Sequence, residues 1–262
     1  MKKDKTLPIG MFDSGIGGLS LYKPIKRLLP QEKIIYISDN LYSPYGKLPS
    51  EEIKKRSFKI VNQLISLNCK LIVVACNTAT TNSITELRKK FEIPFIGIEP
   101  GIKTAALKSS SGVVGILATK GTLTSKLFYK TSNLYASHIK IIEKDGSDLV
   151  ELIEKNKIYE SNTIKLLKNY LKPMIKNKAD VLVLGCTHFQ FLKPIIKPII
   201  KNKMKIYKIN TAIAKQTKSI LINKNILNSI SKKNKNDQFY YTGSNEGLIS
   251  YLKNPKTKKV TI

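Results

Sequence analysis

The stretches Val73-Val74-Ala75-Cys76-Asn77-Thr78 and Val183-Leu184-Gly185-Cys186-Thr187-His188 decide the fold. In each, an apolar run typical of a buried strand ends in a cysteine that small hydroxyl or amide residues follow. This order predicts a thiol at the carboxyl end of a strand, beside the backbone N–H groups of the next turn or helix. Ligands of open α/β sheets bind at such strand ends, and helix N-termini stabilise thiolates and carboxylates. Two thiols that face one pocket would be an acid and a base on opposite sides of one substrate atom.

Length and composition set the limits of the fold. The chain has 262 residues and is 42% hydrophobic, which is enough for two ordinary domains or one large one. We find no apolar run of about 18 residues and no signal-peptide pattern, so we expect a cytoplasmic protein without a membrane partner. The cysteine count of 3 argues against a disulfide framework and favours free thiols in a reducing compartment.

The formal net charge is +28, a value typical of proteins that bind nucleic acid. Nearly all of the positive charge is lysine scattered along the chain, and arginine occurs only at Arg27, Arg56 and Arg88. Phosphate-binding surfaces use arginine forks with interleaved aromatic residues, and neither is concentrated here. We interpret the charge as a bias toward lysine on solvated faces and do not expect nucleic acid as a partner. A basic nucleic-acid- or protein-binding module on the same fold stays as an alternative.

Strand-like apolar runs alternate with amphipathic stretches along the whole chain, which predicts an α/β protein with largely parallel sheets. Strands are expected at 7–12, 33–38, 71–75, 112–118, 139–142 and 180–184. Helices are expected up to about 29 and from about 50, and then at 80–90, 123–130, 147–154, 159–176 and 212–221. A polar connector at 223–237 leads to a last strand–helix unit at 239–252.

A glycine-rich turn, Phe12-Asp13-Ser14-Gly15-Ile16-Gly17-Gly18, follows the first strand. Its glycines allow a ligand to approach the backbone closely, and its N–H groups favour anions. No Gly-Lys-Ser/Thr follows, and Ser20 occupies the position of the third glycine in G-x-G-x-x-G, so we expect no dinucleotide. Asp13 could hold an ammonium group or cap the next helix. Tyr45-Gly46, after Pro44, is by itself an ordinary turn at the same strand-end level.

The cysteines and histidines carry the chemistry. A single strand-end cysteine could be a buried core thiol, but the paired frames of Cys76 and Cys186 favour function, whereas Cys69 lacks such a frame and is expected to be structural. There is no CxxC and only His138 and His188 are present, so no metal is expected. A hydrolase pair of Cys76 and His188 would leave Cys186 unused. His188 could orient the Cys186 thiol or exchange protons with it, while His138 has no motif around it.

Together these motifs resemble the cofactor-independent glutamate racemases of bacterial cell-wall synthesis. The matching segments agree in order and spacing over nearly the whole chain: Pro8-Ile9-Gly10-Met11-Phe12-Asp13-Ser14-Gly15-Ile16-Gly17-Gly18, Pro44-Tyr45-Gly46, Ala75-Cys76-Asn77-Thr78-Ala79-Thr80, Gly97-Ile98-Glu99-Pro100-Gly101 and Leu184-Gly185-Cys186-Thr187-His188. Aspartate racemases of the same superfamily share the paired cysteines but usually have Glu where His188 stands. Racemisation of another amino acid, aspartate first, therefore stays as an alternative.

The resemblance implies two pseudo-symmetric α/β domains with mostly parallel sheets and an active site in the cleft between them. The first domain would comprise 1–98 with 210–262 and carry Cys76, and the second would comprise 99–209 and carry Cys186. The substrate would be glutamate, racemised without a cofactor or a metal to supply D-glutamate for peptidoglycan. Family analogy alone suggests a homodimer.

The resemblance also implies roles for individual residues. Cys76 and Cys186 would carry the protons, Cys76 acting on D-glutamate and Cys186 on L-glutamate, and Asp13 and His188 would help to keep one thiol ionised. The family's catalytic-site Glu aligns best with Glu154, with Glu151 as the alternative, although both could lie on a solvated helix face. The substrate site would be lined by Asp13, Ser14, Tyr45, Gly46, Asn77, Thr78, Thr187 and His188.

Overall fold

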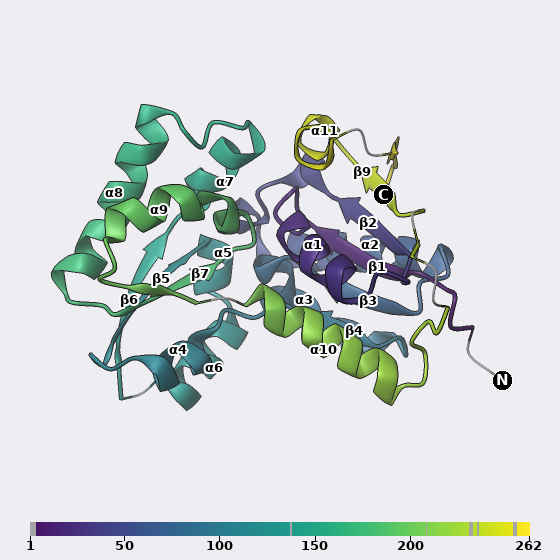
Figure 1. Cartoon of the computed structure of the whole chain (residues 1–262), viewed down its shortest axis with the longest axis horizontal. Helices are drawn as coiled ribbons and strands as arrows, with labels where there is room; N and C mark the ends of the chain where they lie inside the picture. The colour runs from purple at the N-terminus through teal and green to yellow at the C-terminus, as the bar shows by residue number, and fades with distance from the viewer. Residues whose placement is uncertain (1–3, 137, 208, 231–232, 235, 254–255) are drawn as a thin grey trace.

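The computed structural model describes residues 4–136, 138–207, 209–230, 233–234, 236–253 and 256–262. Of the polar connector expected at 223–237, residues 231–232 and 235 lie outside this description. The described chain forms two halves, each built on a parallel sheet with helices on both faces (Figure 1). This confirms the predicted α/β class with parallel sheets.

The first sheet has the strand order β10-β9-β2-β1-β3-β4, and all its pairs are parallel. Its strands are β1 (Ile9–Asp13), β2 (Ile34–Ser38), β3 (Leu71–Val74), β4 (Phe95–Gly97), β9 (Gln238–Tyr241) and β10 (Thr257–Lys259). Its helices are α1 (Leu19–Leu28), α2 (Ser50–Ser66), α3 (Asn77–Lys90), α10 (Asn210–Asn223) and α11 (Glu246–Leu252). Two short 3-10 helices, η1 (Asn40–Tyr42) and η2 (Tyr45–Lys47), lie between β2 and α2.

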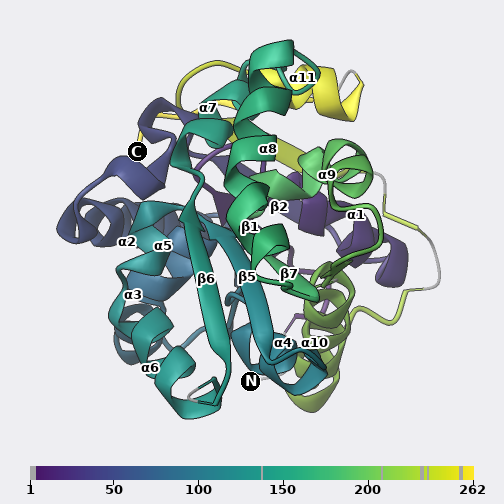
Figure 2. The ribbon, with the colours of Figure 1, turned by 90° about the vertical axis from the view of Figure 1, so that its left-hand side faces the viewer.

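The second sheet has the order β6-β5-β7-β8, again with parallel pairs. Its strands are β5 (Val113–Ala118), β6 (Lys140–Asp145), β7 (Val181–Gly185) and β8 (Lys205–Ile206). Its helices are α4 (Ile102–Lys108), α5 (Lys120–Leu123), α6 (Lys126–Tyr135), α7 (Ser147–Glu154), α8 (Ser161–Lys176), η3 (His188–Leu192, 3-10) and α9 (Lys193–Ile200). In Figure 2, α8 and α9 lie on one side of this sheet and α4 and α6 on the other.

The two sheets share one topology. The order β2-β1-β3-β4 in the first sheet is repeated by β6-β5-β7-β8 in the second, so β1 and β3 correspond to β5 and β7. The central strands are buried along their whole length because helices cover both faces, which explains their continuous apolar sequences. Along β3, Leu71 and Val73 pack toward α1 and α10, whereas Ile72 and Val74 pack toward α2 and α3.

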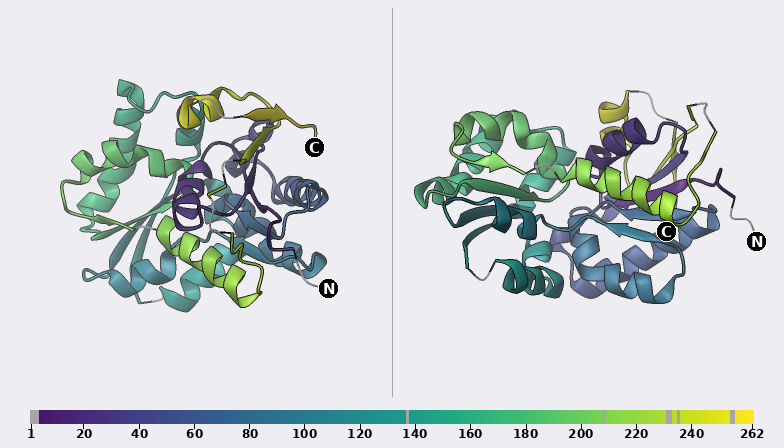
Figure 3. Two further views of the ribbon diagram at one scale, coloured as in Figure 1. Left: turned by 45° about the vertical axis from the view of Figure 1, so that its right-hand side comes forward. Right: turned by 60° about the horizontal axis from the view of Figure 1, so that its bottom comes forward.

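The C-terminal part of the chain returns to the first half. Helix α10 packs along α1, and β9 pairs with β2 and with the edge strand β10 of the first sheet (Figure 3). We propose that the two halves are domains, the first comprising 1–98 with 210–262 and the second 99–209. This division assigns every strand to the sheet in which it pairs.

Several elements differ from the sequence-based expectation. Helix α3 begins at Asn77, three residues earlier than expected, because Cys76 is its N-cap. The single helix expected at 123–130 is divided into α5 and α6, since Ser125 caps a new helix. Strands β4, β8 and β10 were not predicted because they have at most three residues, too few for a pattern to emerge. Helices α4 and α9 were also missed.

No helix in the described ranges is both long enough and apolar enough to span a bilayer.

A buried ion pair joins β3 to the loop before β2. Lys70 Nζ lies 2.6 Å from Glu32 Oε2, with side chains 3% and 0% exposed. We expect Lys70→Met to lower the free energy of unfolding by about 3–5 kcal/mol, because it leaves the Glu32 carboxylate buried without its counter-charge. Urea denaturation measures this loss. In the control Lys54→Met, the partner Glu51 is 85% exposed, so the loss should stay below about 1 kcal/mol. Equal losses in the two variants would contradict the prediction.

Candidate active site

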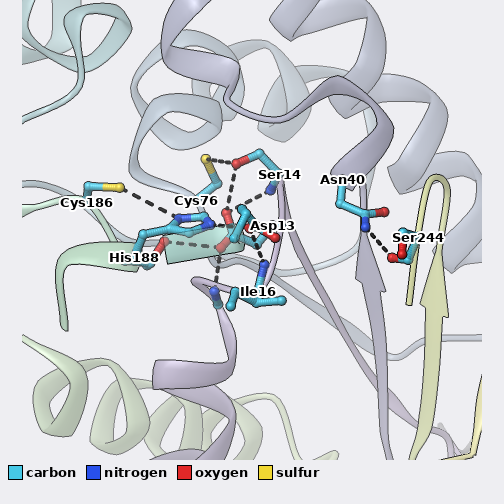
Figure 4. Close-up of polar contacts among 12 residues, drawn as sticks. Asp13, Ser14, Ile16, Asn40, Cys76, Cys186, His188 and Ser244 are labelled. Carbon is cyan, nitrogen blue, oxygen red and sulfur yellow. Dashed lines mark hydrogen bonds and ion pairs between the residues drawn. The ribbon is translucent and has the colours of Figure 1, made fainter. Parts of the chain in front are cut away.

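Asp13, Ser14 and Cys76 of the first half lie beside Cys186 and His188 of the second half (Figure 4). Asp13 ends β1, Cys76 follows β3, and Cys186 follows β7, so both halves contribute. In parallel sheets the ligand-binding crevice lies at this edge, because the strands end there and helices begin. The fold therefore brings together segments that are far apart in the sequence.

Cys76 occupies the N-cap of α3 and is 5% exposed. Its Sγ accepts a hydrogen bond from the Ala79 N–H at 3.4 Å and lies 3.8 Å from Ser14 Oγ. Burial raises the pKa of the Cys76 thiol well above its ordinary value, the Asp13 charge adds to the rise, and the Ala79 N–H opposes it. Cys76 therefore rests as a thiol, the form that can donate a proton. A negative charge on Cys186 also raises this pKa.

Cys186 directly follows β7 in the second half and is 7% exposed. Its Sγ lies 3.8 Å from His188 Nδ1. His188 itself begins η3, a 3-10 helix, rather than an α-helix, and this tight turn carries the imidazole back over the cysteine.

His188 connects Cys186 to a carboxylate. Its Nε2 lies 2.5 Å from Glu154 Oε1, so the buried imidazole has a polar partner at each nitrogen. Burial lowers the pKa of His188, but the hydrogen bonds to Cys186 and Glu154 and the negative charge of Glu154 outweigh it, and the net shift is well upward. The raised pKa favours the imidazolium, the form that donates at both nitrogens.

Glu154, at the end of α7, joins the two halves. Its Oε1 accepts from His188 and also from the Ile16 N–H of the glycine-rich turn, at 2.8 Å. Glu151, the alternative considered from the sequence, lies outside this cluster and forms a half-exposed ion pair with Lys47 at 2.6 Å.

Asp13 is fully buried beneath the glycine-rich turn. It accepts hydrogen bonds from the N–H of Ser14 at 2.7 Å, from the N–H of Gly18, and from Thr187 Oγ1 at 3.1 Å. Burial raises the pKa of Asp13, and the charge of His188 opposes this rise. A Cβ on Gly17 would lie 2.3 Å from His188 Nδ1, so only glycine lets the turn approach so closely.

The other expected lining residues are buried around this cluster. Asn77 donates from Nδ2 to the Ile98 carbonyl at 3.2 Å, while its buried Oδ1 has no hydrogen-bond partner within the described structure. Thr78 Oγ1 lies 2.8 Å from Thr119 Oγ1 and 3.2 Å from Thr122 Oγ1, across the boundary between the halves.

Thr119 and Thr122 were missed by sequence analysis. The signal was available, because Thr119 directly follows the buried strand β5, just as the cysteine frames follow β3 and β7. The signal is weak, however, because a threonine after a strand is by itself a common helix cap.

Tyr45 and Gly46 lie in η2, between β2 and α2, and Tyr45 packs in the same buried cluster as Cys76. The Tyr45 hydroxyl donates to Asp39 Oδ2 at 2.5 Å. Gly46 lies against the second half, where an added Cβ would be 2.6 Å from the Thr119 Cβ. The structure thus fixes the tyrosine hydroxyl on Asp39 and brings Gly46 against the second half.

Among the described residues, no group of three or more His, Cys, Asp or Glu side chains is arranged to hold a metal ion. Cys69 lies apart from the cluster, packed against Gly10, and burial raises its pKa to about 12.

A cavity of about 360 Å³ lies beside Glu154 at the boundary between the halves. Its lining includes Asn40, Ser43, Glu151, Glu154, Ser244 and Glu246. The arrangement is thus two thiols from opposite halves, flanked by an Asp and a His–Glu pair, which can deliver and remove a proton at one substrate atom.

Comparisons with known proteins agree with this chemistry. The sequence model of the Asp/Glu/hydantoin racemase family matches residues 9–217. A glutamate racemase of Herpetosiphon aurantiacus is 41% identical over 224 residues, which cover 86% of this chain and 88% of that protein. The crystal structure of glutamate racemase isoform RacE1 from Bacillus anthracis is 31% identical, with a TM-score of 0.88 and 98% of both chains covered. The glutamate racemase of Escherichia coli, crystallised with L-glutamate and the activator UDP-MurNAc-Ala, is 32% identical, with a TM-score of 0.84 and 97% of both chains covered.

Proposed function

Because the chain belongs to the Asp/Glu/hydantoin racemase family, we propose that it is a glutamate racemase whose two proton carriers are Cys76 and Cys186. One observation supports the assignment of these two carriers. The two buried thiols lie at strand ends of opposite halves, around one cluster of Asp13, His188 and Glu154.

The reaction is an exchange of one proton at Cα. A thiolate removes the Cα proton from one face, and the electron pair left on Cα delocalises into the substrate α-carboxylate. The thiol on the other side then donates its proton to the opposite face, so the enantiomer forms and the two sulfurs have exchanged protonation states. The reverse reaction starts from that exchanged state, and no electron acceptor or cofactor is consumed.

The surrounding groups support this exchange. When Cys186 is in its thiolate state, the His188 imidazolium can donate a hydrogen bond to its sulfur. The hydroxyl and amide groups of Ser14, Asn77 and Thr78 suit the hydrogen bonding of a carboxylate, and the N-terminus of α3 favours negative charge there. The unpartnered Oδ1 of Asn77 can accept from the substrate ammonium group.

The substrate is glutamate, as in the relatives that match most of the chain. The product D-glutamate would serve peptidoglycan synthesis, and we place the enzyme in the cytoplasm, where its free thiols stay reduced.

The direct test follows the optical signal of L-glutamate and D-glutamate separately, with a reducing agent and without pyridoxal phosphate. We expect both signals to decay to zero and deuterium to enter at Cα in D₂O. Decay with aspartate but not with glutamate would keep the mechanism and change the substrate. Silence on both, together with steeply salt-dependent DNA binding, would favour the binding-module alternative.

Glu154→Gln should change the pH dependence of the reaction. The wild-type pKa of His188 is raised, in part by the Glu154 charge, so removal of that charge lowers the pKa and deprotonates the imidazolium at a lower pH. We expect the alkaline limb of the kcat/KM profile to move toward lower pH, with a loss of about 10- to 100-fold at pH 8 and a smaller loss at pH 6.

The matched control is Glu151→Gln, three residues earlier on the same helix and paired with Lys47. Its exposed ion pair contributes little, so its profile should stay close to that of the wild type. A shift in Glu151→Gln but not in Glu154→Gln would overturn the assignment of Glu154.

A further inference from the structure

A second buried ion pair lies behind the loop that carries Tyr45 and Gly46. Arg56 of α2 contacts Asp39, the residue after β2, through Nε to Oδ2 at 2.9 Å and Nη2 to Oδ1 at 2.7 Å. The side chains are 2% and 0% exposed. This bidentate geometry fixes the plane of the carboxylate as well as its position, which a single contact would not do.

The same carboxylate holds the loop. Oδ2 of Asp39, already paired with Arg56 Nε, also accepts from the Tyr45 hydroxyl at 2.5 Å. The Arg56 guanidinium further lies 3.9 Å from the centre of the Tyr42 ring, in cation–π contact. Arg56 therefore contacts η1 through Tyr42 and reaches η2 through Asp39.

The guanidinium is fixed from a third side. Nη1 donates to the Ile262 carbonyl at 2.6 Å, so the segment after β10 covers the pair. With its Nε and both terminal nitrogens bonded in one plane, the side chain cannot change its orientation without breaking several hydrogen bonds at once.

The loop held in this way crosses to the second half. Gly46 lies against Thr119, one of the hydroxyl residues around Thr78. Lys47 pairs with Asp148 at 3.2 Å and with Glu151 at 2.6 Å on α7. A displacement of Tyr45 would therefore be transmitted to the boundary between the halves, where the substrate is expected to bind.

We propose that Arg56 is a positioning residue for substrate binding: through the carboxylate of Asp39 it fixes Tyr45, and with it the loop over residues 40–47 that lines the site. The expected kinetic effect of Arg56 rests on the proposed glutamate racemase function, whereas its effect on the loop follows from the geometry alone. Arg56 touches neither cysteine, so the loss should fall on KM more than on kcat.

The chain supplies a matched control. Among the described residues, Lys70 and Glu32 form the other ion pair in which both side chains are almost unexposed, also in the first half. Glu32 accepts in addition from the Asn228 N–H, and Lys70 donates to the Lys5 carbonyl, so this pair serves segments far from the loop. Lys70→Gln should destabilise the fold as Arg56→Gln does, without moving residues 40–47.

The experiment compares Arg56→Gln, Arg56→Lys and Lys70→Gln with the wild type. Steady-state kinetics are measured with L- and D-glutamate, and hydrogen–deuterium exchange is followed in peptides that cover 40–48. We expect Arg56→Gln to raise KM about tenfold for both enantiomers, with a smaller change in kcat, and to speed exchange in that loop. Arg56→Lys keeps the charge but loses the fork, so it should fold and show an intermediate effect. Lys70→Gln should leave KM and the loop exchange unchanged.

The kinetic and exchange results together distinguish the effect of Arg56 on the loop from its effect on substrate binding. Unchanged KM and exchange in both Arg56 variants, or an equal rise of KM in Lys70→Gln, would overturn the proposal. Faster exchange with unchanged KM would show that Arg56 holds the loop but that substrate binding does not depend on it, which also contradicts the proposal. If the wild type proved inactive on glutamate, the proposed function would fail, while the exchange data would still decide whether Arg56 holds the loop.

Discussion

Replacing either Cys76 or Cys186 by alanine is expected to abolish racemisation in both directions, with a loss of at least about 10³-fold in kcat/KM. Each direction needs one sulfur to remove the Cα proton and the other to supply its replacement. The loss of either sulfur therefore removes a base in one direction and an acid in the other. The measurement is the decay of the optical signal from pure L-glutamate and from pure D-glutamate.

The equilibrium constant of a racemisation also fixes the ratio of kcat/KM for the two directions. Enantiomers have equal free energies in an achiral solvent, so the values of kcat/KM for the two directions must stay equal in every variant. A cysteine variant that lost kcat/KM in only one direction would show that the reaction followed is not a simple racemisation.

Cys69→Ala is the control for both variants. Cys69 is buried like the other two cysteines, yet it packs against Gly10, away from Asp13 and His188. Its loss should leave turnover within a few-fold of the wild type, apart from some stability lost with the cavity. Equal losses of activity in Cys69→Ala and Cys76→Ala would contradict the assignment of the proton carriers.

The parts of the fold with strong local patterns were predictable. The strands that end before Cys76 and Cys186 are buried on both faces, so their apolar runs are uninterrupted and their ends are sharp. Helix α7 was predicted with its observed bounds, Ser147–Glu154, because its apolar residues recur at helical spacing. The short edge strands β8 and β10 have no such pattern, since pairing with a neighbouring strand alone defines them.

The site was predictable only where a motif names its residues. Cys76, Cys186 and His188 stand in recognisable frames, and the structure places them in one cluster with Asp13. The role of Arg56 could not be predicted, because its partner Asp39 lies in another element and no local pattern connects the two. Contacts of this kind depend on the tertiary fold.

The repeated strand order explains why both sulfurs reach one site. Each half places its cysteine after the strand that pairs directly with β1 or with β5, at the same edge of the sheet. The two thiols therefore come from opposite halves, as the proposed proton exchange at one carbon requires. The partners differ, however: Cys186 contacts His188, whereas Cys76 contacts Ser14 and the Ala79 N–H.

Because His188 contacts Cys186 and not Cys76, its replacement is the second substitution for which we expect a large loss of activity. His188→Asn is expected to lower kcat/KM by about 10²- to 10³-fold, because Cys186 loses the imidazolium donor and Glu154 loses its buried partner. The loss of kcat/KM must be equal in the two directions, since the equilibrium is fixed. The separate values of kcat and KM need not change equally, because His188 contacts Cys186 and not Cys76. Initial rates over a range of L- and D-glutamate concentrations measure both parameters.

The control is His138→Asn, which changes an exposed histidine outside the site and should leave all four kinetic parameters unchanged. The pH profile adds a second criterion. His188→Asn removes the imidazole whose pKa is raised in the wild type. The contribution of this imidazole to the alkaline limb of the kcat/KM profile should therefore be absent in His188→Asn and present in His138→Asn. Activity of His188→Asn within a few-fold of the wild type, with the alkaline limb intact, would show that the cysteines exchange protons without this histidine. Glu154 would then act only as a structural link between α7 and the Ile16 N–H.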